Sequence, residues 1–149
     1  MTQSKKYIPE GLPAVIPQLV VKDARALMDF ATRAFGAENS HAMPGPDGKG
    51  VMHGMFFIAG APVFVADANE RMPAAQCQLF VYVPDVDAAF ERATQAGARA
   101  IMPPTDMFWG DRWGMLVDAW GNTWQVATNK EFVPPEEMQK RMMASMKQG

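Results

Sequence analysis

The sequence is poor in the side chains that carry metals, disulfides and nucleophilic catalysis. Its 149 residues include one cysteine, Cys77, and two histidines, His41 and His53. One cysteine cannot form an intramolecular disulfide, and three such residues are too few for a zinc site with four cysteine and histidine ligands. None of the three serines lies in a Gly-x-Ser-x-Gly motif, so the nucleophile elbow of the α/β-hydrolases is excluded.

An excess of charge of one sign and long apolar runs are also lacking. The 14 basic and 16 acidic residues are mixed along the chain, which gives no field to attract a phosphate backbone. The apolar stretch at residues 55–66 is broken by a glycine and a proline and is shorter than the roughly 20 residues that span a bilayer. The polar N-terminus lacks the pattern of a signal peptide. We therefore expect a cytoplasmic protein without nucleic-acid or membrane partners.

The chain instead contains an internal repeat. Residues 19–38 (LVVKDARALMDFATRAFGAE) reappear, one residue shorter, as residues 81–99 (VYVPDVDAAFERATQAGAR). Asp85 follows Asp23 by 62 residues, and Gly97 follows Gly36 by 61. The segments that follow, from Gly54 and from Gly114, match at offsets of 60 or 61. The repeat predicts two copies of one module.

The repeat also sets the expected domain organisation. An N-terminal extension (residues 1–14) precedes the first module (15–67), a polar linker (68–76) joins it to the second module (77–128), and a tail (129–149) follows. At this length the two modules form one domain.

Each module is predicted to contain one strand, one helix and three further strands. Residues 15–21 and 77–83 are short apolar runs, each followed by an aspartate that can cap a helix. The helices are expected to end at Gly36 and Gly97. Hairpins follow at residues 51–67 and 113–128, with glycine and Asn122 supplying the left-handed turn positions. The predicted fold is α+β: two βαβββ modules whose sheets face a shared trough, plus a C-terminal helix.

The tail has the signals of a helix. Two prolines at 134 and 135 precede Glu136 and Glu137, which can pair with the basic residues 140 and 141. Met138, Met142 and Met146 form one stripe along this helix. We interpret the stripe as a surface that docks on the domain or on a neighbouring subunit; a methionine-rich lid over a ligand is the alternative.

Several motifs resemble those of a known superfamily. They are residues 16–23 (IPQLVVKD), 51–54 (VMHG), 108–114 (FWGDRWG) and 118–128 (DAWGNTWQVAT). These segments resemble the vicinal oxygen chelate superfamily, which includes glyoxalase I, bleomycin-resistance proteins and extradiol dioxygenases, and within it the PhnB-like, glyoxalase-like branch. The resemblance covers about residues 12–128. It implies two βαβββ modules around a cleft, and commonly a homodimer.

The resemblance also implies four metal-ligand positions, which in this chain are Ile16, Phe64, Gln78 and Gln125. Isoleucine and phenylalanine have no donor atom, and neutral amides bind first-row metals poorly. We therefore expect no metal and no cofactor. The alternative is a site with a single histidine, in which His53 joins Gln78 and Gln125.

The FWGDRWG motif is the most specific local feature. In a structural interpretation, Trp109 and Trp113 fill the core while Asp111 and Arg112 form an ion pair or cap the loop. In a functional interpretation, the same aromatic rings and charged pair lie at the mouth of the cleft and hold a planar or cationic ligand.

The sequence thus favours a metal-independent protein of the bleomycin-resistance type that binds a drug or an aromatic metabolite in an apolar cleft. The candidate ligand-binding residues are Ile16, His53, Phe64, Gln78, Trp109, Asp111, Arg112, Trp113 and Gln125. One alternative is a lyase, isomerase or dioxygenase of the glyoxalase kind, with an atypical metal site or with acid–base chemistry from His53 and Asp111. Another is an accessory protein with a vestigial cleft. No catalytic residue is assigned from the sequence.

Overall fold

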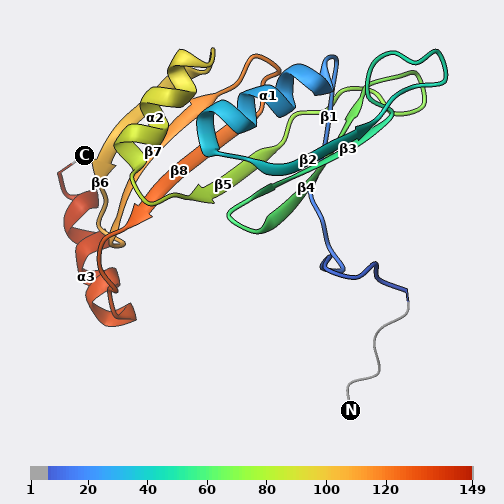
Figure 1. Cartoon of the computed structure of the whole chain (residues 1–149). Helices are drawn as coiled ribbons and strands as arrows, with labels where there is room; N and C mark the ends of the chain where they lie inside the picture. Colours follow the sequence, from blue (N-terminus) through green and yellow to red (C-terminus); the bar gives the residue numbers. More distant parts are fainter. Residues whose placement is uncertain (1–6, 149) are drawn as a thin grey trace. The chain divides into compact units, whose positions relative to one another are not determined.

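The computed structural model describes residues 7–148, which form two units. The first unit takes in the described residues up to Ala75, apart from Arg33–Phe35. The second takes in Arg33–Phe35 and the chain from Gln76 onward. Each unit contains one four-stranded mixed sheet (Figure 1).

The first unit has the element order that the repeat predicts. Its elements are β1 (Gln18–Val21), α1 (Ala24–Phe35), β2 (Glu38–Met43), β3 (His53–Ile58) and β4 (Ala61–Asp67). The sheet order is β1-β4-β3-β2. β1 and β4 run parallel and the other pairs run antiparallel, so the first and last strands of the module are neighbours.

The second unit repeats this topology. Its elements are β5 (Gln78–Tyr82), α2 (Val86–Gln95), β6 (Arg99–Asp106), β7 (Asp111–Val117), β8 (Thr123–Asn129) and a final helix α3 (Pro135–Met146). The sheet order is β5-β8-β7-β6, with β5 and β8 parallel. Two βαβββ modules and a C-terminal helix are thereby confirmed.

The helix boundaries follow the predicted signals. Asp23 Oδ1 accepts a hydrogen bond from Ala26 N at 3.0 Å, and Asp85 Oδ1 accepts one from Ala88 N at 3.1 Å, so both helices have the expected N-cap. Gly36 ends α1 in the left-handed conformation, with φ 68°.

Corresponding glycines lie beneath the two helices. A Cβ atom at Gly54 of β3 would lie 3.2 Å from the sulfur of Met28 in α1, and one at Gly114 of β7 would lie 3.0 Å from the ring of Phe90 in α2. Side chains alternate along a strand, so this contact identifies the helix-covered face of each sheet. Buried Phe56 and Leu116 lie on these faces.

A polar side chain on the last strand of each module ties down the start of its helix. Asp67 Oδ1 accepts from Ala24 N at 2.8 Å and its Oδ2 accepts from Val51 N at 2.6 Å. At the corresponding position, Thr128 Oγ1 accepts from Val86 N at 2.9 Å. In each module, a side chain of the last strand therefore supplies an acceptor to the first backbone N–H of the helix, which has no partner within the helix itself. The first module uses an aspartate and the second uses a threonine.

Two details of the predicted fold are wrong. Ile16 precedes β1, which begins at Gln18, because Pro17 has no N–H for a ladder and restricts the residue before it. In the β3–β4 turn Gly60 is left-handed as predicted, and so is Ala59, but Asn122 is not among the left-handed residues described. The Asn122 side chain instead accepts from Cys77 N at 2.9 Å.

The predicted docking of the methionine stripe on the domain is also not seen. α3 forms as expected, but none of its residues is buried. Met138 is half-buried, while Met142 and Met146 remain 39% and 69% exposed. Docking on a neighbouring subunit stays a prediction.

Candidate functional site

The face of the second sheet that points away from α2 carries a group of aromatic side chains. The strand registers place Tyr82, Ala127 and Trp113 in one row across β5, β8 and β7, and Phe80, Gln125 and Met115 in the next. Leu116 and Gly114, which alternate with these residues on β7, lie on the α2 side. The set Gln78, Phe80, Tyr82, Trp113, Met115, Val117, Thr123, Gln125 and Ala127 is called the aromatic face below.

Exposure on the aromatic face is concentrated on β5. Phe80 is 45% exposed and Tyr82 is 57% exposed, and their ring centroids are 5.1 Å apart. Trp113 is buried, and Trp109, in the loop before β7, meets it edge to face at 5.9 Å. Two solvent-facing rings therefore lie on the same sheet face as the buried indole of Trp113, which contacts the half-buried indole of Trp109.

One buried carboxylate organises this end of the sheet. Asp111 is 3% exposed. Its Oδ2 accepts from the Tyr82 hydroxyl and from Trp109 Nε1, both at 2.9 Å, and its Oδ1 accepts from Asn129 Nδ2 at 2.9 Å. The three donors come from β5, from the loop before β7 and from β8, so Asp111 sets the positions of two aromatic rings.

Asp111 also raises the pKa of Tyr82 above its ordinary value of 10.0. The largest cause is burial of the hydroxyl, followed by the hydrogen bond to Asp111 and by the negative charge of that carboxylate. Both Asp111 effects favour the protonated phenol.

Arg112 has a different role from the predicted ion pair with Asp111. It points to the other side of β7, where its Nε donates to Asp87 Oδ2 at 2.8 Å and its Nη1 donates to Asp106 Oδ1 at 3.2 Å. Neighbouring residues on a strand face opposite ways, which separates Arg112 from Asp111. The predicted Asp111–Arg112 pair is therefore wrong, and Arg112 ties the start of α2 to β6.

The turn before β7 requires a glycine. Gly110 has φ 101°, and a Cβ atom there would lie 2.4 Å from the carbonyl oxygen of Glu131. This close approach places Lys130 N within 2.8 Å of the Gly110 carbonyl oxygen. Beside it lies a pocket of about 390 Å³, lined by Asp106, Met107, Gly110, Asp111, Lys130 and Glu131.

The residues at the four implied metal positions do not fit a metal ion. Phe64 lies on β4 with its ring edge to face with His53 at 4.7 Å, and neither Phe64 nor Ile16 has a donor atom. Gln125 Oε1 already accepts from Trp113 Nε1 at 3.0 Å. Within residues 7–148, no three histidine, cysteine, aspartate or glutamate side chains are grouped to hold a metal.

The candidate residues are divided between the two units. Ile16, His53 and Phe64 belong to the first, and Gln78, Trp109, Asp111, Arg112, Trp113 and Gln125 belong to the second. Within the first, His53 lies on the same face of β3 as Met55 and Phe57, and all three are half-buried. The site formed by His53 with Gln78 and Gln125 stays a prediction.

Sequence reasoning overlooked three residues of this site: Phe80, Tyr82 and Asn129. The sequence contains a signal for Phe80 and Tyr82, because they alternate with other residues along the same predicted strand as Gln78 and must therefore share its face. Asn129 lies just past the predicted end of its strand, and no pattern in the sequence links it to Asp111.

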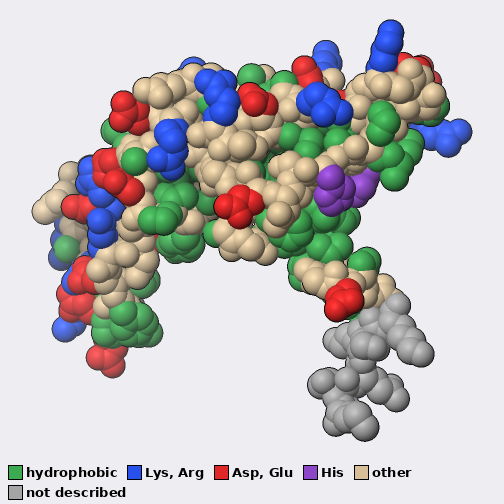
Figure 2. All heavy atoms as spheres, in the orientation of Figure 1, with side chains coloured by type: hydrophobic (Ala, Val, Ile, Leu, Met, Phe, Trp, Pro, Cys, Tyr) green, Lys and Arg blue, Asp and Glu red, His purple; other side chains and the backbone are tan. Residues whose placement is uncertain are grey.

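The surface and the helices add two observations on partners. On the face shown in Figure 2, basic and acidic side chains are interspersed rather than gathered by sign. Among the helices described, none has both the length and the apolarity to cross a membrane.

Comparisons with known proteins assign the family. The model of the Glyoxalase/Bleomycin resistance protein/Dioxygenase superfamily matches residues 14–126. "Uncharacterized protein Rv0887c" of Mycobacterium tuberculosis is 35% identical over 141 residues, covering 87% of this chain and 82% of that protein. "Uncharacterized protein Mb0911c" of Mycobacterium bovis is also 35% identical, with 92% of that protein covered.

Solved structures agree with the family match. TioX from Micromonospora sp. ML1 is 26% identical with a TM-score of 0.66, covering 78% of this chain and 98% of TioX. A glyoxalase/bleomycin resistance protein/dioxygenase from Nocardioides is 22% identical with a TM-score of 0.59, covering 88% of this chain and 93% of that one, and shows the fold alone. With a family model matching most of its length, the chain belongs to the glyoxalase/bleomycin resistance protein/dioxygenase superfamily, the vicinal oxygen chelate proteins.

Proposed function

We propose that this protein binds a planar aromatic small molecule, such as a drug or an aromatic metabolite, without the help of a metal ion. The aromatic face of the second unit is the proposed binding surface. The observation that carries the proposal is the exposure of two adjacent rings, Phe80 at 45% and Tyr82 at 57%, on that face.

The chemistry of these side chains suits a flat apolar ligand. Aromatic rings stack with an energy of about 0.5–1.5 kcal/mol beyond the gain from burying their area. The Tyr82 ring is held by its bond to Asp111, so it loses little freedom when a ligand stacks on it. The amide of Gln78 is exposed on the same face and can supply a directed hydrogen bond.

Metal independence is supported by the residues at the positions where the family holds its metal. Two of the four lack donor atoms, and the amide oxygen of Gln125 is engaged by Trp113. Ile16, His53 and Phe64 of the first unit stay candidate ligand-binding residues in this proposal.

Tryptophan fluorescence provides the test. The protein is titrated with a panel of planar aromatic compounds, with and without EDTA, and quenching of Trp109 and Trp113 is followed. We expect saturable quenching by at least one compound, with a Kd that EDTA leaves unchanged. No saturable quenching by any compound, or loss of binding in EDTA, would contradict the proposal.

A matched pair of variants locates the binding surface. Phe80→Ala removes an exposed ring from the aromatic face, whereas Phe132→Ala removes a ring that is 83% exposed outside it. Loss of one stacking contact is expected to raise Kd about 3- to 10-fold in the first variant and to leave it unchanged in the second. Equal effects of both variants would place binding elsewhere.

A further inference from the structure

The two histidines of the chain lie on the same face of the first sheet. His41 is on β2 and His53 is on β3, the neighbouring strand. The antiparallel register sets His41 opposite Met55. It also sets Met43 opposite His53. Directly opposed side chains point to the same side of a sheet, so two imidazoles and two thioethers share one face. These four residues are called the His–Met cluster.

The His–Met cluster lies on the face of the sheet that points away from α1. Ala42 and Gly54, which alternate with the cluster residues, are paired with each other. A Cβ atom at Gly54 would lie 3.2 Å from the sulfur of Met28 in α1, so alternation turns the cluster to the opposite side. The two cluster residues on β2 are exposed and the two on β3 are half-buried. Figure 2 shows histidine atoms at the surface with hydrophobic side chains next to them.

The spacing within the cluster suits a shared ion. Directly opposed residues of an antiparallel pair have Cβ atoms about 4.5–5.5 Å apart, and diagonal neighbours are within about 8 Å. Imidazole and thioether side chains extend well beyond their Cβ atoms, and methionine has three rotatable bonds. Four donor atoms can therefore meet above this pair of strands.

The imidazole nitrogens are available for such an ion. Within residues 7–148, no hydrogen bond or ion pair involves the side chain of either histidine. The His53 ring instead meets the Phe64 ring edge to face, with centroids 4.7 Å apart and an interplanar angle of 82°. The cluster therefore has an aromatic neighbour that shields one side of it from water.

The donor set favours Cu(I). Thioethers are soft ligands that suit this ion, and imidazole is also a copper ligand. All four donors are uncharged when they bind a metal, so in a half-buried site a monovalent ion brings less uncompensated charge than a divalent one. Glu38, the acidic residue of β2, lies outside the cluster, opposite Phe57 and beyond a shift in the strand register. Calcium and magnesium require the oxygen ligands that the cluster lacks.

The second module provides a comparison within the same chain. On its strands β6 and β7, Met102 lies opposite Met115, but Thr105 lies opposite Trp113. Trp113 follows His53 by 60 residues, so it occupies the corresponding place in the repeat. The second module thus keeps a pair of thioethers without an imidazole.

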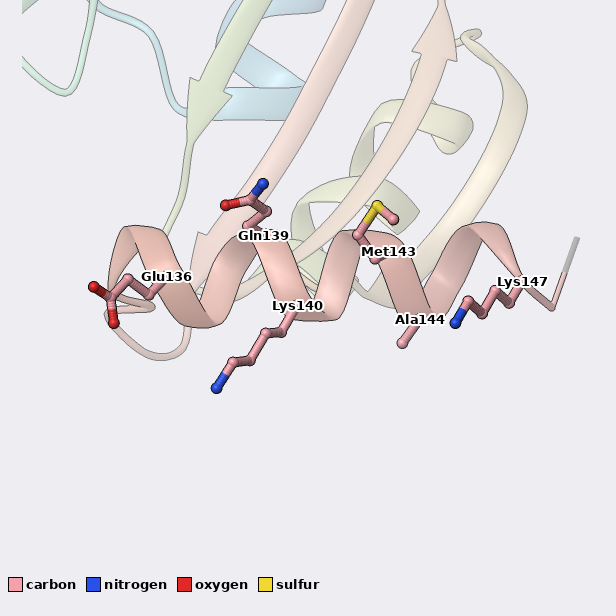
Figure 3. A pocket seen from close by; sticks show the side chains of 6 residues that line it. All are labelled: Glu136, Gln139, Lys140, Met143, Ala144 and Lys147. Atoms are coloured by element: carbon pink, nitrogen blue, oxygen red, sulfur yellow. The ribbon is translucent and has the colours of Figure 1, made fainter.

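Exposed methionines also lie on α3, again without a histidine. The shallow hollow of about 590 Å³ along this helix is lined by Glu136, Gln139, Lys140, Met143, Ala144 and Lys147. Figure 3 shows Met143 as the one thioether among these six side chains. The two lysine ammonium groups there disfavour a cation, so Met143 serves as a control below.

We propose that the His–Met cluster binds one Cu(I) ion, with its two imidazoles and its two thioether sulfurs as ligands. The cluster shares no residue with the four metal positions that the family resemblance implies. It also shares none with the aromatic face of the second unit, so this inference does not rest on the proposed function.

Anaerobic competition of the full chain with bicinchoninate, a chromogenic Cu(I) chelator, tests the proposal. The wild type is expected to bind one Cu(I) ion per chain. Met43→Leu and Met55→Leu each remove a sulfur at nearly constant volume. Each should raise the Kd for Cu(I) at least about 10-fold, because loss of an outer-shell partner alone costs about 10–100-fold. Met102→Leu and Met143→Leu, at positions 41% and 51% exposed, are the matched controls and should leave Kd unchanged.

Nuclear magnetic resonance of the imidazole nitrogens gives an independent readout. Because the chain has two histidines, both should shift when one equivalent of Ag(I), a redox-inert ion of the same charge, is added. Phe80→Ala, which changes the aromatic face, should leave Cu(I) binding unchanged, so the two proposals can fail separately. Failure to compete with the chelator, equal losses in the cluster and control variants, or shifts confined to one imidazole would each overturn the proposal.

Discussion

The Tyr82 hydroxyl donates a hydrogen bond to Asp111 Oδ2 at 2.9 Å, although the tyrosine is 57% exposed and the aspartate only 3%. An exposed ring on β5 is thereby held by a carboxylate that is buried on β7. The same oxygen accepts from Trp109 Nε1, so the two rings share one acceptor. Removing the negative charge of Asp111 should therefore have a measurable effect on both the Tyr82 ring and the Trp109 ring.

The Asp111→Asn variant should lower the pKa of Tyr82 relative to the wild type. The side-chain amide oxygen can still accept one hydrogen bond, but the negative charge that disfavours tyrosinate is gone. Burial of the hydroxyl, the largest cause of the raised pKa, remains, so the pKa should stay above its ordinary value. Tyrosinate absorbance measures the titration, and Tyr82→Phe identifies which transition belongs to Tyr82. An unchanged titration in Asp111→Asn would contradict this assignment.

The raised pKa also determines the direction of a stability change. The unfolded chain releases the Tyr82 proton near its ordinary pKa of about 10, before the folded chain does. The contribution of this hydrogen bond to the free energy of unfolding is therefore fully present below that pH and is lost as the pH rises through the folded pKa. In urea unfolding, the difference in the free energy of unfolding between the wild type and Tyr82→Phe should shrink as the pH rises above about 10.

Alanine at Gly114 should cost more stability than alanine at the corresponding Gly54. The new Cβ would lie 3.0 Å from the Phe90 ring and 3.1 Å from the Met102 carbonyl oxygen, both held in place by secondary structure. At Gly54 the near atoms are side-chain atoms only, including the flexible end of Met28. We expect Gly114→Ala to lower the free energy of unfolding by about 1–3 kcal/mol. Urea denaturation compares the two variants, and a larger loss in Gly54→Ala would refute the explanation.

Asp118→Ala should be among the most destabilising single changes in the second unit. Asp118 is 5% exposed and accepts from the backbone N–H groups of Trp120 and Asn122, from Asn122 Nδ2 and from Trp124 Nε1. An alanine removes this shared acceptor, at a cost of about 1–3 kcal/mol for each buried hydrogen bond that is not replaced. Asp47→Ala, which removes one exposed bond to Lys49 N, is the control and should cost less than about 1 kcal/mol. Similar losses in the two variants would contradict the role given to Asp118.

Much of the fold could be predicted because it depends on local signals that occur twice. The caps at Asp23 and Asp85 and the left-handed Gly36 act within one turn of a helix. An alignment of the chain with itself reveals these signals without any knowledge of tertiary contacts. The strand order follows less directly, since the parallel pairing of β1 with β4 joins segments about 45 residues apart.

The candidate site was harder to predict because its contacts cross strands. Asp111 and Arg112 are adjacent in sequence, yet the pleat of β7 sends them to different partners. Tyr82 and Asn129 reach Asp111 from 29 and 18 residues away. The predicted docking of the methionine stripe on the domain failed for a related reason: helical periodicity shows which residues share a face but not whether another surface covers it.

The parallel pairing of first and last strands also affects the order of folding. Leu19 pairs with Val65, and Leu79 pairs with Trp124, so β1 and β5 have no place in a sheet until the rest of their module has been synthesised. During translation the apolar residues of β1 therefore have no strand to pair with until β4 has been synthesised. The antiparallel pair β3–β4, in contrast, can form from adjacent sequence. Assembly of each module is expected to begin at its hairpin and to finish with the strand that leaves the ribosome first.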